Sequence, residues 1–131
     1  MADEMRKLLN RYEELARIHA SIDYGDLRSV KQANDAVDEM ISISRNVSLM
    51  GEGGLEAFMT LLDIPANKVH LWAAHHILEY MNFSVSLEQR ALGIIREHAK
   101  DESANAFGER WWLKDWEEKH KRGASFPDAA A

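Results

Sequence analysis

The stretch that decides the fold is residues 68–82, KVHLWAAHHILEYMN. When these residues are placed at 100° per step, the apolar side chains cover most of the helical circumference. Trp72 and His76 border a narrow polar arc, which consists of Lys68, His75, Glu79 and Asn82. A helix that is apolar on nearly all sides is packed between neighbouring elements. We therefore predict that this helix is central to the domain.

Apolar residues recur every three or four positions through most of the remaining chain. This periodicity predicts helices over about residues 3–20, 27–45, 55–62, 68–81, 86–100 and 105–121. Gly25, the glycine-rich run 51–54 and Pro65 interrupt it. No stretch alternates with period two for long enough to indicate a sheet. The predicted fold class is all-α.

Three of the predicted helix starts carry capping signals. Asp26 and Asn67 precede the second and fourth helices, and residues 86–89, SLEQ, match a capping box at the start of the fifth. The apolar stripe of the second helix begins at Leu27. The last helix is expected to end at Lys121, because Gly123 can terminate it.

Short connections between these helices predict three antiparallel hairpins, formed by the first with the second, the third with the fourth, and the fifth with the sixth. The second and third hairpins would each span about 30–36 residues, a unit size typical of stacked helical repeats. An irregular six-helix bundle would show the same periodicity. Both arrangements therefore stay open at this point.

The length and composition limit the number of domains. The chain has 131 residues, two prolines and no cysteine, which favours one domain over residues 1–122 with a flexible tail over residues 123–131. The absence of cysteine excludes disulfides and thiolate metal sites. No apolar run approaches the roughly 18–20 residues that span a bilayer, and the first residues do not match a signal peptide. We expect a cytoplasmic protein.

Two sets of residues resemble a known family. Asp63-Ile64-Pro65 followed by Val69-His70, Ala73-Ala74 and Leu78 resembles the turn and second helix of a HEAT repeat, although the family usually has arginine where His70 stands. Residues 69–79, together with residues 113–116, LKDW, resemble a bacterial family of small HEAT-like proteins described only as a domain of unknown function. The resemblance covers roughly residues 53–120. It implies a short HEAT-like α-solenoid, and its similarity to immunity proteins implies the binding of a toxin.

The charge of the chain limits the partners it can bind. Sixteen Lys and Arg against 22 Asp and Glu give a formal net charge of −6. Nucleic-acid binding needs a clustered basic surface that releases counterions, so this class is disfavoured. A surplus of acidic residues can instead attract a basic protein.

The sequence offers little support for catalysis. It contains no cysteine nucleophile, no G-x-S-x-G motif and no HExxH motif. His75 and Glu79 stand four residues apart on one helix face, which leaves a small His/Glu metalloprotein as one hypothesis. We expect no catalytic residue, no cofactor and no bound metal.

These observations favour a non-enzymatic protein-binding module, and specifically an immunity-type protein that neutralises a toxin. The second, fourth and last predicted helices would present the partner-binding residues, which are Asp35, Asp38, Glu39, Lys68, Trp72, His75, Glu79 and Trp111. Trp112 and Trp116 share the opposite face of the last helix and are expected in the core. The alternative is a HEAT-like nucleic-acid-binding protein or a DNA glycosylase-like enzyme, and the His/Glu metalloprotein comes third.

Overall fold

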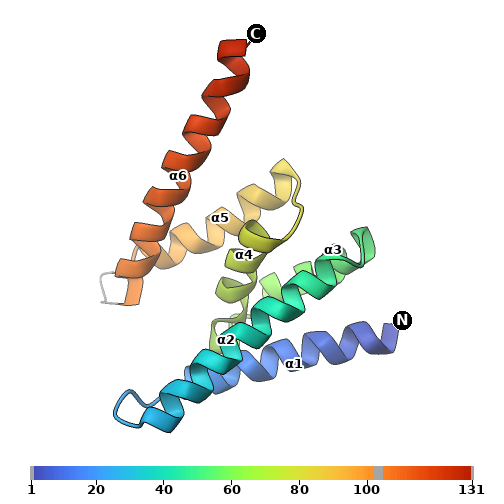
Figure 1. The fold of residues 1–131 in the computed structure, drawn as a ribbon, viewed down its shortest axis with the longest axis vertical. Helices are drawn as coiled ribbons and strands as arrows, with labels where there is room; N and C mark the ends of the chain where they lie inside the picture. The colour runs from blue at the N-terminus through green and yellow to red at the C-terminus, as the bar shows by residue number, and fades with distance from the viewer. Residues whose placement is uncertain (1, 102–104, 131) are drawn as a thin grey trace. The chain divides into compact units, whose positions relative to one another are not determined.

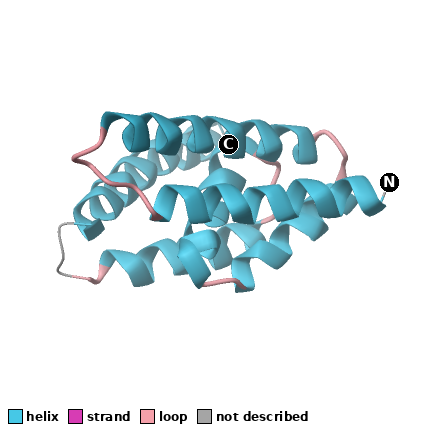
Figure 2. Ribbon diagram, turned by 90° about the horizontal axis from the view of Figure 1, so that it is seen from below, coloured by secondary structure: helices cyan, strands magenta, loops and turns pink. Residues whose placement is uncertain are grey.

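The computed structural model describes residues 2–101 and 105–130, of which residues 2, 105 and 121–130 are described by their backbone alone. Within these ranges the chain forms helices and loops and no strand (Figure 2). The described helices are α1 (Ala2–Ala20), α2 (Leu27–Ser48), α3 (Glu52–Met59), α4 (Val69–Tyr80), α5 (Val85–Ala99) and α6 (Asn105–Ala130), with the 3₁₀ turns η1 (Thr60–Asp63) and η2 (Ala66–Lys68). The predicted all-α class is confirmed. None of these helices is both long and apolar enough to cross a membrane.

The chain divides into two compact units, which we call unit 1 (residues 1–91) and unit 2 (residues 92–131). Unit 1 holds α1 to α4 and the first half of α5, and unit 2 holds the second half of α5 and α6 (Figure 1). The predicted domain over residues 1–122 spans this boundary and stays a prediction.

In unit 1, α1 and α2 form the predicted antiparallel hairpin and pack along each other (Figure 1). Their connection is held by local hydrogen bonds. The Asp23 carboxylate accepts from the Gly25 amide at 2.9 Å, and Asp26 caps α2 by accepting from the Arg28 amide at 2.9 Å. The predicted cap at Asp26 is confirmed, because an aspartate in extended backbone can reach the free amides of the first turn.

Helix α4 lies at the centre of unit 1, as its all-round apolar sequence predicts. It contacts α1 and α2 in addition to η1 and η2. Ala73, Ala74 and Ile77 are fully buried, and the two alanines allow neighbouring helices a close approach. The predicted third helix, residues 55–62, divides into α3 and η1; α4 packs extensively on η1 but little on α3, so the pairing of the third helix with α4 stays a prediction. The HEAT-like solenoid therefore stays a prediction.

Two starts of helices differ from the prediction. Asn67 and Lys68 both adopt left-handed backbone, with φ of 54° and 60°, and no side chain caps α4. Helix α5 begins at Val85, one residue earlier than expected, and the Ser84 hydroxyl, which accepts from the Leu87 amide at 3.1 Å, takes the role assigned to Ser86. Several serines near a helix start can each act as the cap, and the fold of the loop selects one.

The second helix and the glycine-rich run also differ from the prediction. Helix α2 continues past Arg45 to Ser48, and Leu27 is 86% exposed while Ala33 and Val47 are buried. Of the glycine-rich run 51–54, only Gly51, at φ 79°, lies outside a helix, since α3 already begins at Glu52. A glycine costs a helix only about 1 kcal/mol, which packing can offset.

Unit 2 contains two helical segments joined through polar contacts. The Arg96 guanidinium lies 3.6 Å from the Glu117 carboxylate, and Arg110 donates to the backbone oxygens of Ala99 and Asp101 at 3.1 and 2.7 Å. The buried apolar side chains of this unit are Leu92, Ile95, Ala106 and Leu113. The backbone of α6 continues through Ala130, beyond the predicted end at Lys121.

Candidate binding surfaces

A buried polar pair lies under the α4 surface. His76, which the sequence places at the border of a polar arc, is only 2% exposed. Its Nδ1 lies 2.7 Å from the Oη of Tyr12, which is fully buried on α1. Phe58 packs edge-on against the Tyr12 ring, with centroids 5.1 Å apart. The sequence carried one signal for this pair, an aromatic hydroxyl in the apolar stripe of the first helix, but it could not indicate the partner.

Burial determines the protonation of this pair. Desolvation, with a smaller contribution from His75, lowers the pKa of His76 to about 3. Desolvation also raises the pKa of Tyr12 well above its usual value. Both groups are therefore neutral at pH 7, and we assign the phenol as the donor to Nδ1 with the ring proton on Nε2. A pair closed to solvent supports packing and not catalysis.

Trp72 is half-buried and belongs to the same aromatic group. Its ring meets His19 of α1 edge-on, with centroids 4.9 Å apart, and lies 5.8 Å from the His76 ring. Partial burial, followed by the charge of Lys68, lowers the pKa of His19. Lys68 itself is exposed. Trp72 is thus packed on one side, and only its remaining edge could meet a partner.

The three acidic residues proposed on α2 do not present three free charges. Asp35 pairs with Lys31 at 2.8 Å, and both oxygens of Glu39 accept from Arg11 of α1, at 2.7 and 2.9 Å. The hydrogen bonds from Arg11 lower the pKa of Glu39. Asp38 is exposed, and no ion pair reaches it from the part of the chain that the structure describes. The field that would attract a basic partner is therefore weaker here than the sequence suggests.

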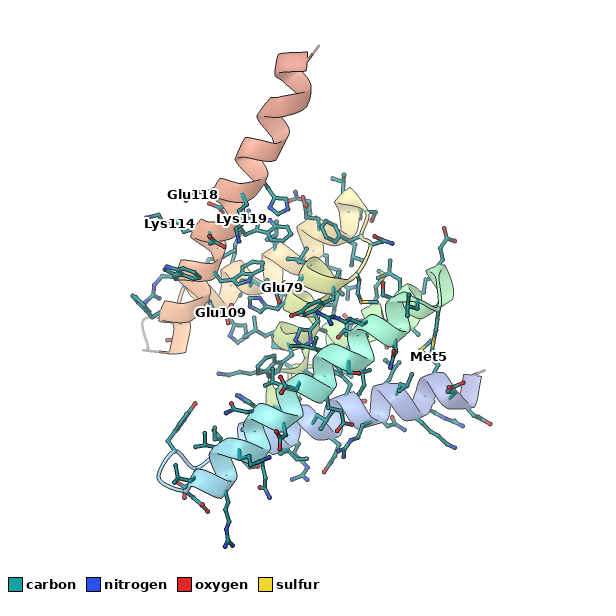
Figure 3. The ribbon with its side chains drawn as sticks, viewed as in Figure 1. Met5, Glu79, Glu109, Lys114, Glu118 and Lys119 are labelled. Carbon is teal, nitrogen blue, oxygen red and sulfur yellow. The ribbon has the colours of Figure 1, made fainter. Side chains whose placement is uncertain are left out.

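The remaining α4 residues of the predicted surface are His75, which is half-buried, and Glu79, which is exposed (Figure 3). Over residues 2–101 and 105–120, no group of three or more His, Asp and Glu could hold a metal ion. The His/Glu metalloprotein hypothesis consequently finds no geometric support in this part of the chain.

Helix α6 carries an exposed aromatic pair. Phe107 and Trp111, one helical turn apart, are 67% and 62% exposed. Charged side chains continue along the same helix, among them Lys114, Glu118 and Lys119 (Figure 3). Trp111 therefore has the exposure that an interface anchor needs. Trp111 belongs to unit 2, whereas the candidate residues of α2 and α4 belong to unit 1, so we treat them as two separate surfaces.

Trp112 and Trp116 are half-buried, so the expectation that they lie in the core is wrong. Their rings stack at 5.3 Å, and the Trp116 ring stacks on His120 at 3.6 Å. Spacing of four residues places side chains above one another on a helix. Here that spacing produces stacking along α6 and only partial burial, because periodicity identifies a face but not what covers it.

Sequence reasoning missed a surface at the end of unit 1 where α2, α3 and the α4–α5 loop meet. Three large apolar side chains are exposed beside these segments, namely Leu49 and Met50 between α2 and α3, and Val85 at the start of α5. A pocket lies among the same segments. The signal in the sequence was an apolar pair, Leu49-Met50, directly before the glycine-rich run.

Comparison with known proteins adds no relative. No protein-family model matches the chain, and neither the curated proteins nor the solved structures yield a match. The resemblance to HEAT repeats therefore rests on the short motifs quoted above. Within those motifs, Asp63 does pair with an arginine, Arg90 of α5, at 2.6 Å.

Proposed function

We propose that this protein is a non-enzymatic module that binds another polypeptide. The observation that carries the proposal is the exposed pair Phe107 and Trp111 on one face of α6. Large aromatic side chains are usually well buried, and an exposed tryptophan with a neighbouring aromatic is a common anchor of protein interfaces. Nearby charged residues would form the polar rim of such an interface.

The charge of unit 1 supports a basic partner. Residues 1–91 carry nine Lys and Arg against fourteen Asp and Glu, a net charge of −5. Several of these carboxylates are neutralised by ion pairs, so the attraction depends on the others, Asp38 among them. Electrostatic complementarity of this kind mainly accelerates association.

Within this class we favour an immunity-type role, in which the partner is a toxin domain that the protein neutralises. A toxin that acts on nucleic acid has a basic surface, and an acidic module would compete for that surface. The resemblance of residues 53–120 to small HEAT-like proteins supports the same role. The acidic charge argues against the alternative of nucleic-acid binding.

Binding kinetics test this proposal. Candidate ligands are purified toxin-like domains, taken first from reading frames adjacent to this gene, and dissociation is followed by a surface-binding assay. Trp111→Ala should accelerate dissociation roughly 30- to 150-fold, because a desolvated aromatic anchor contributes about 2–3 kcal/mol. Tyr24→Ala is the matched control, since Tyr24 is an aromatic residue that is 79% exposed on the α1–α2 loop.

Equal dissociation rates for the Trp111→Ala variant and the unmodified protein would show that Trp111 does not anchor the partner. Binding of duplex DNA at physiological salt, with no affinity for any polypeptide tested, would replace the proposal with the nucleic-acid alternative. Circular dichroism of each variant shows whether the helices are intact.

A further inference from the structure

A pocket of about 440 Å³ opens at one end of unit 1. It lies where the end of α2 and the start of α3 meet the loop between α4 and α5. Its wall combines hydroxyl, amide and carboxylate groups with apolar side chains, and the lining residues are Ser48, Gly51, Glu52, Leu55, Met81, Asn82, Phe83 and Ser84. Polar and apolar groups contribute about equally to this wall, so it can contact both a charged group and an aliphatic side chain.

The walls of this pocket are held by tight backbone packing. Gly51 turns the chain between α2 and α3 at φ 79°, a conformation that favours glycine. A Cβ at Gly54 would lie 2.2 Å from the Val47 carbonyl oxygen, so α3 can approach the end of α2 this closely only with glycine there. On the other wall, the Ser84 hydroxyl caps α5 and is occupied by the Leu87 amide. Contacts within the chain therefore hold the ends of α2, α3 and α5 that border the pocket.

Exposed apolar residues adjoin the pocket. Leu49 and Met50 lie in the chain between two lining residues and are 86% and 42% exposed, and Val85 follows the lining residue Ser84 and is 77% exposed. They are three of the seven large apolar side chains that are exposed among the described residues. Single exposed apolar residues are ordinary, but several around one concavity indicate an interaction site.

The segments that build the pocket carry negative charge only. No lysine or arginine occurs in residues 46–67 or 69–89, whereas Glu52 lines the pocket and Glu56 follows it by one turn of α3. Glu52 is exposed, and no ion pair involves it in the described part of the chain. The nearest cation before this region, the Arg45 guanidinium, is engaged over the Tyr80 ring at 5.0 Å.

We propose that this pocket docks a basic segment of a partner polypeptide. One large aliphatic side chain of that segment enters between Leu55 and Met81, and a flanking lysine or arginine pairs with Glu52. The apolar rim at Leu49, Met50 and Val85 covers the rest of the segment and excludes water from the pair. The inference rests on the proposed function as a polypeptide-binding module, but it concerns a different surface from Trp111.

A peptide with the expected chemistry tests the proposal directly. The probe is the acetylated and amidated peptide KKLKK, titrated into the full-length ¹⁵N-labelled protein and followed by amide chemical shifts. We expect saturable shifts confined to residues 48–55 and 81–85. Two matched peptides serve as controls: EELEE reverses the charge, KKGKK removes the aliphatic side chain, and neither should produce these shifts.

A variant of the protein tests whether Glu52 supplies the negative charge that the peptide recognises. Glu52→Gln should weaken KKLKK binding at least 3-fold while leaving the rest of the spectrum unchanged, because Glu52 is exposed and forms no ion pair with any described residue. Glu4→Gln, which removes an exposed carboxylate from α1 far along the chain, should have no effect.

Three results would overturn the inference. Shifts that fall outside residues 48–55 and 81–85 would place the site elsewhere, and equal binding of EELEE would exclude charge recognition. A concentration-dependent dimer that Leu49→Ser abolishes would assign the surface to a second copy of this chain. Because these readouts do not involve Trp111, a failure here leaves the α6 anchor standing, and loss of the Trp111 effect alone leaves the pocket standing.

Discussion

At the scale of single residues, the buried pair of Tyr12 and His76 shows how a polar group is accommodated in a helical core. A buried imidazole without a partner would cost about 1–3 kcal/mol, and the phenol at 2.7 Å removes that cost. Phe58 packs against the Tyr12 ring and Trp72 against the His76 ring, and both members of the pair are buried. The pair consequently links α1 to α4 through a buried hydrogen bond.

This pair predicts how stability depends on pH. The folded pKa of His76 is about 3, below its ordinary value of 6.5, so the unfolded chain binds the proton first as the pH falls. The contribution of His76 to the free energy of unfolding is complete above pH 6.5 and decreases by about 1.4 kcal/mol per unit between pH 6 and 4. Urea unfolding at several pH values measures this slope.

His76→Asn keeps a side chain that can accept the phenol proton but does not titrate. Between pH 6 and 4, the free energy of unfolding of this variant should therefore fall by about 1.4 kcal/mol per pH unit less than that of the unmodified protein. His120→Asn, an exposed histidine of α6, is the control and should keep the original slope. Identical slopes for His76→Asn and the unmodified protein would show that His76 does not titrate differently in the folded state.

At the scale of elements, two adjacent glycines in α3 have opposite roles. A Cβ at Gly54 would lie 2.2 Å from the Val47 carbonyl oxygen and 3.0 Å from the Met50 Cβ, whereas a Cβ at Gly53 would meet nothing within 4 Å. Gly54→Ala should therefore destabilise the fold by about 1–3 kcal/mol, as expected for forced overpacking. Gly53→Ala should stabilise it by about 0.4–1 kcal/mol, because alanine restricts the unfolded chain.

Thermal or chemical unfolding of the two variants measures this difference. Since the substitutions are chemically identical and adjacent, each is the control for the other. A neutral Gly54→Ala would mean that α3 can move away from the end of α2 at no cost, and the pocket beside it would then have no fixed wall.

At the scale of the whole molecule, the two units differ in how much apolar surface they bury. Only Leu92, Ile95, Ala106 and Leu113 of the buried apolar side chains in the described residues belong to unit 2. Local opening needs less free energy where fewer apolar contacts are broken. We expect amides of residues 106–120 to exchange with deuterium faster than those of residues 71–78 in α4. Equal protection of both segments in hydrogen-exchange measurements would contradict this difference.

The sequence by itself determined the features that depend on neighbours along the chain. The all-round apolar pattern of residues 69–80 predicted the central position of α4, and Asp26 predicted the cap of α2. The helical class followed from periodicity in the same way. These properties require only the side chains within one or two turns, so composition and spacing are sufficient to predict them.

Only the tertiary structure decided which faces meet and which remain exposed. Tyr12 and His76 are 64 positions apart, and Arg11 and Glu39 are 28 apart, so no local pattern could pair them. Periodicity likewise assigned Leu27 and Trp116 to apolar faces. It did not indicate that Leu27 is exposed and that Trp116 is half-buried. A helical pattern defines the direction of a side chain relative to its own axis, and burial depends on the separate question of where the other helices pack.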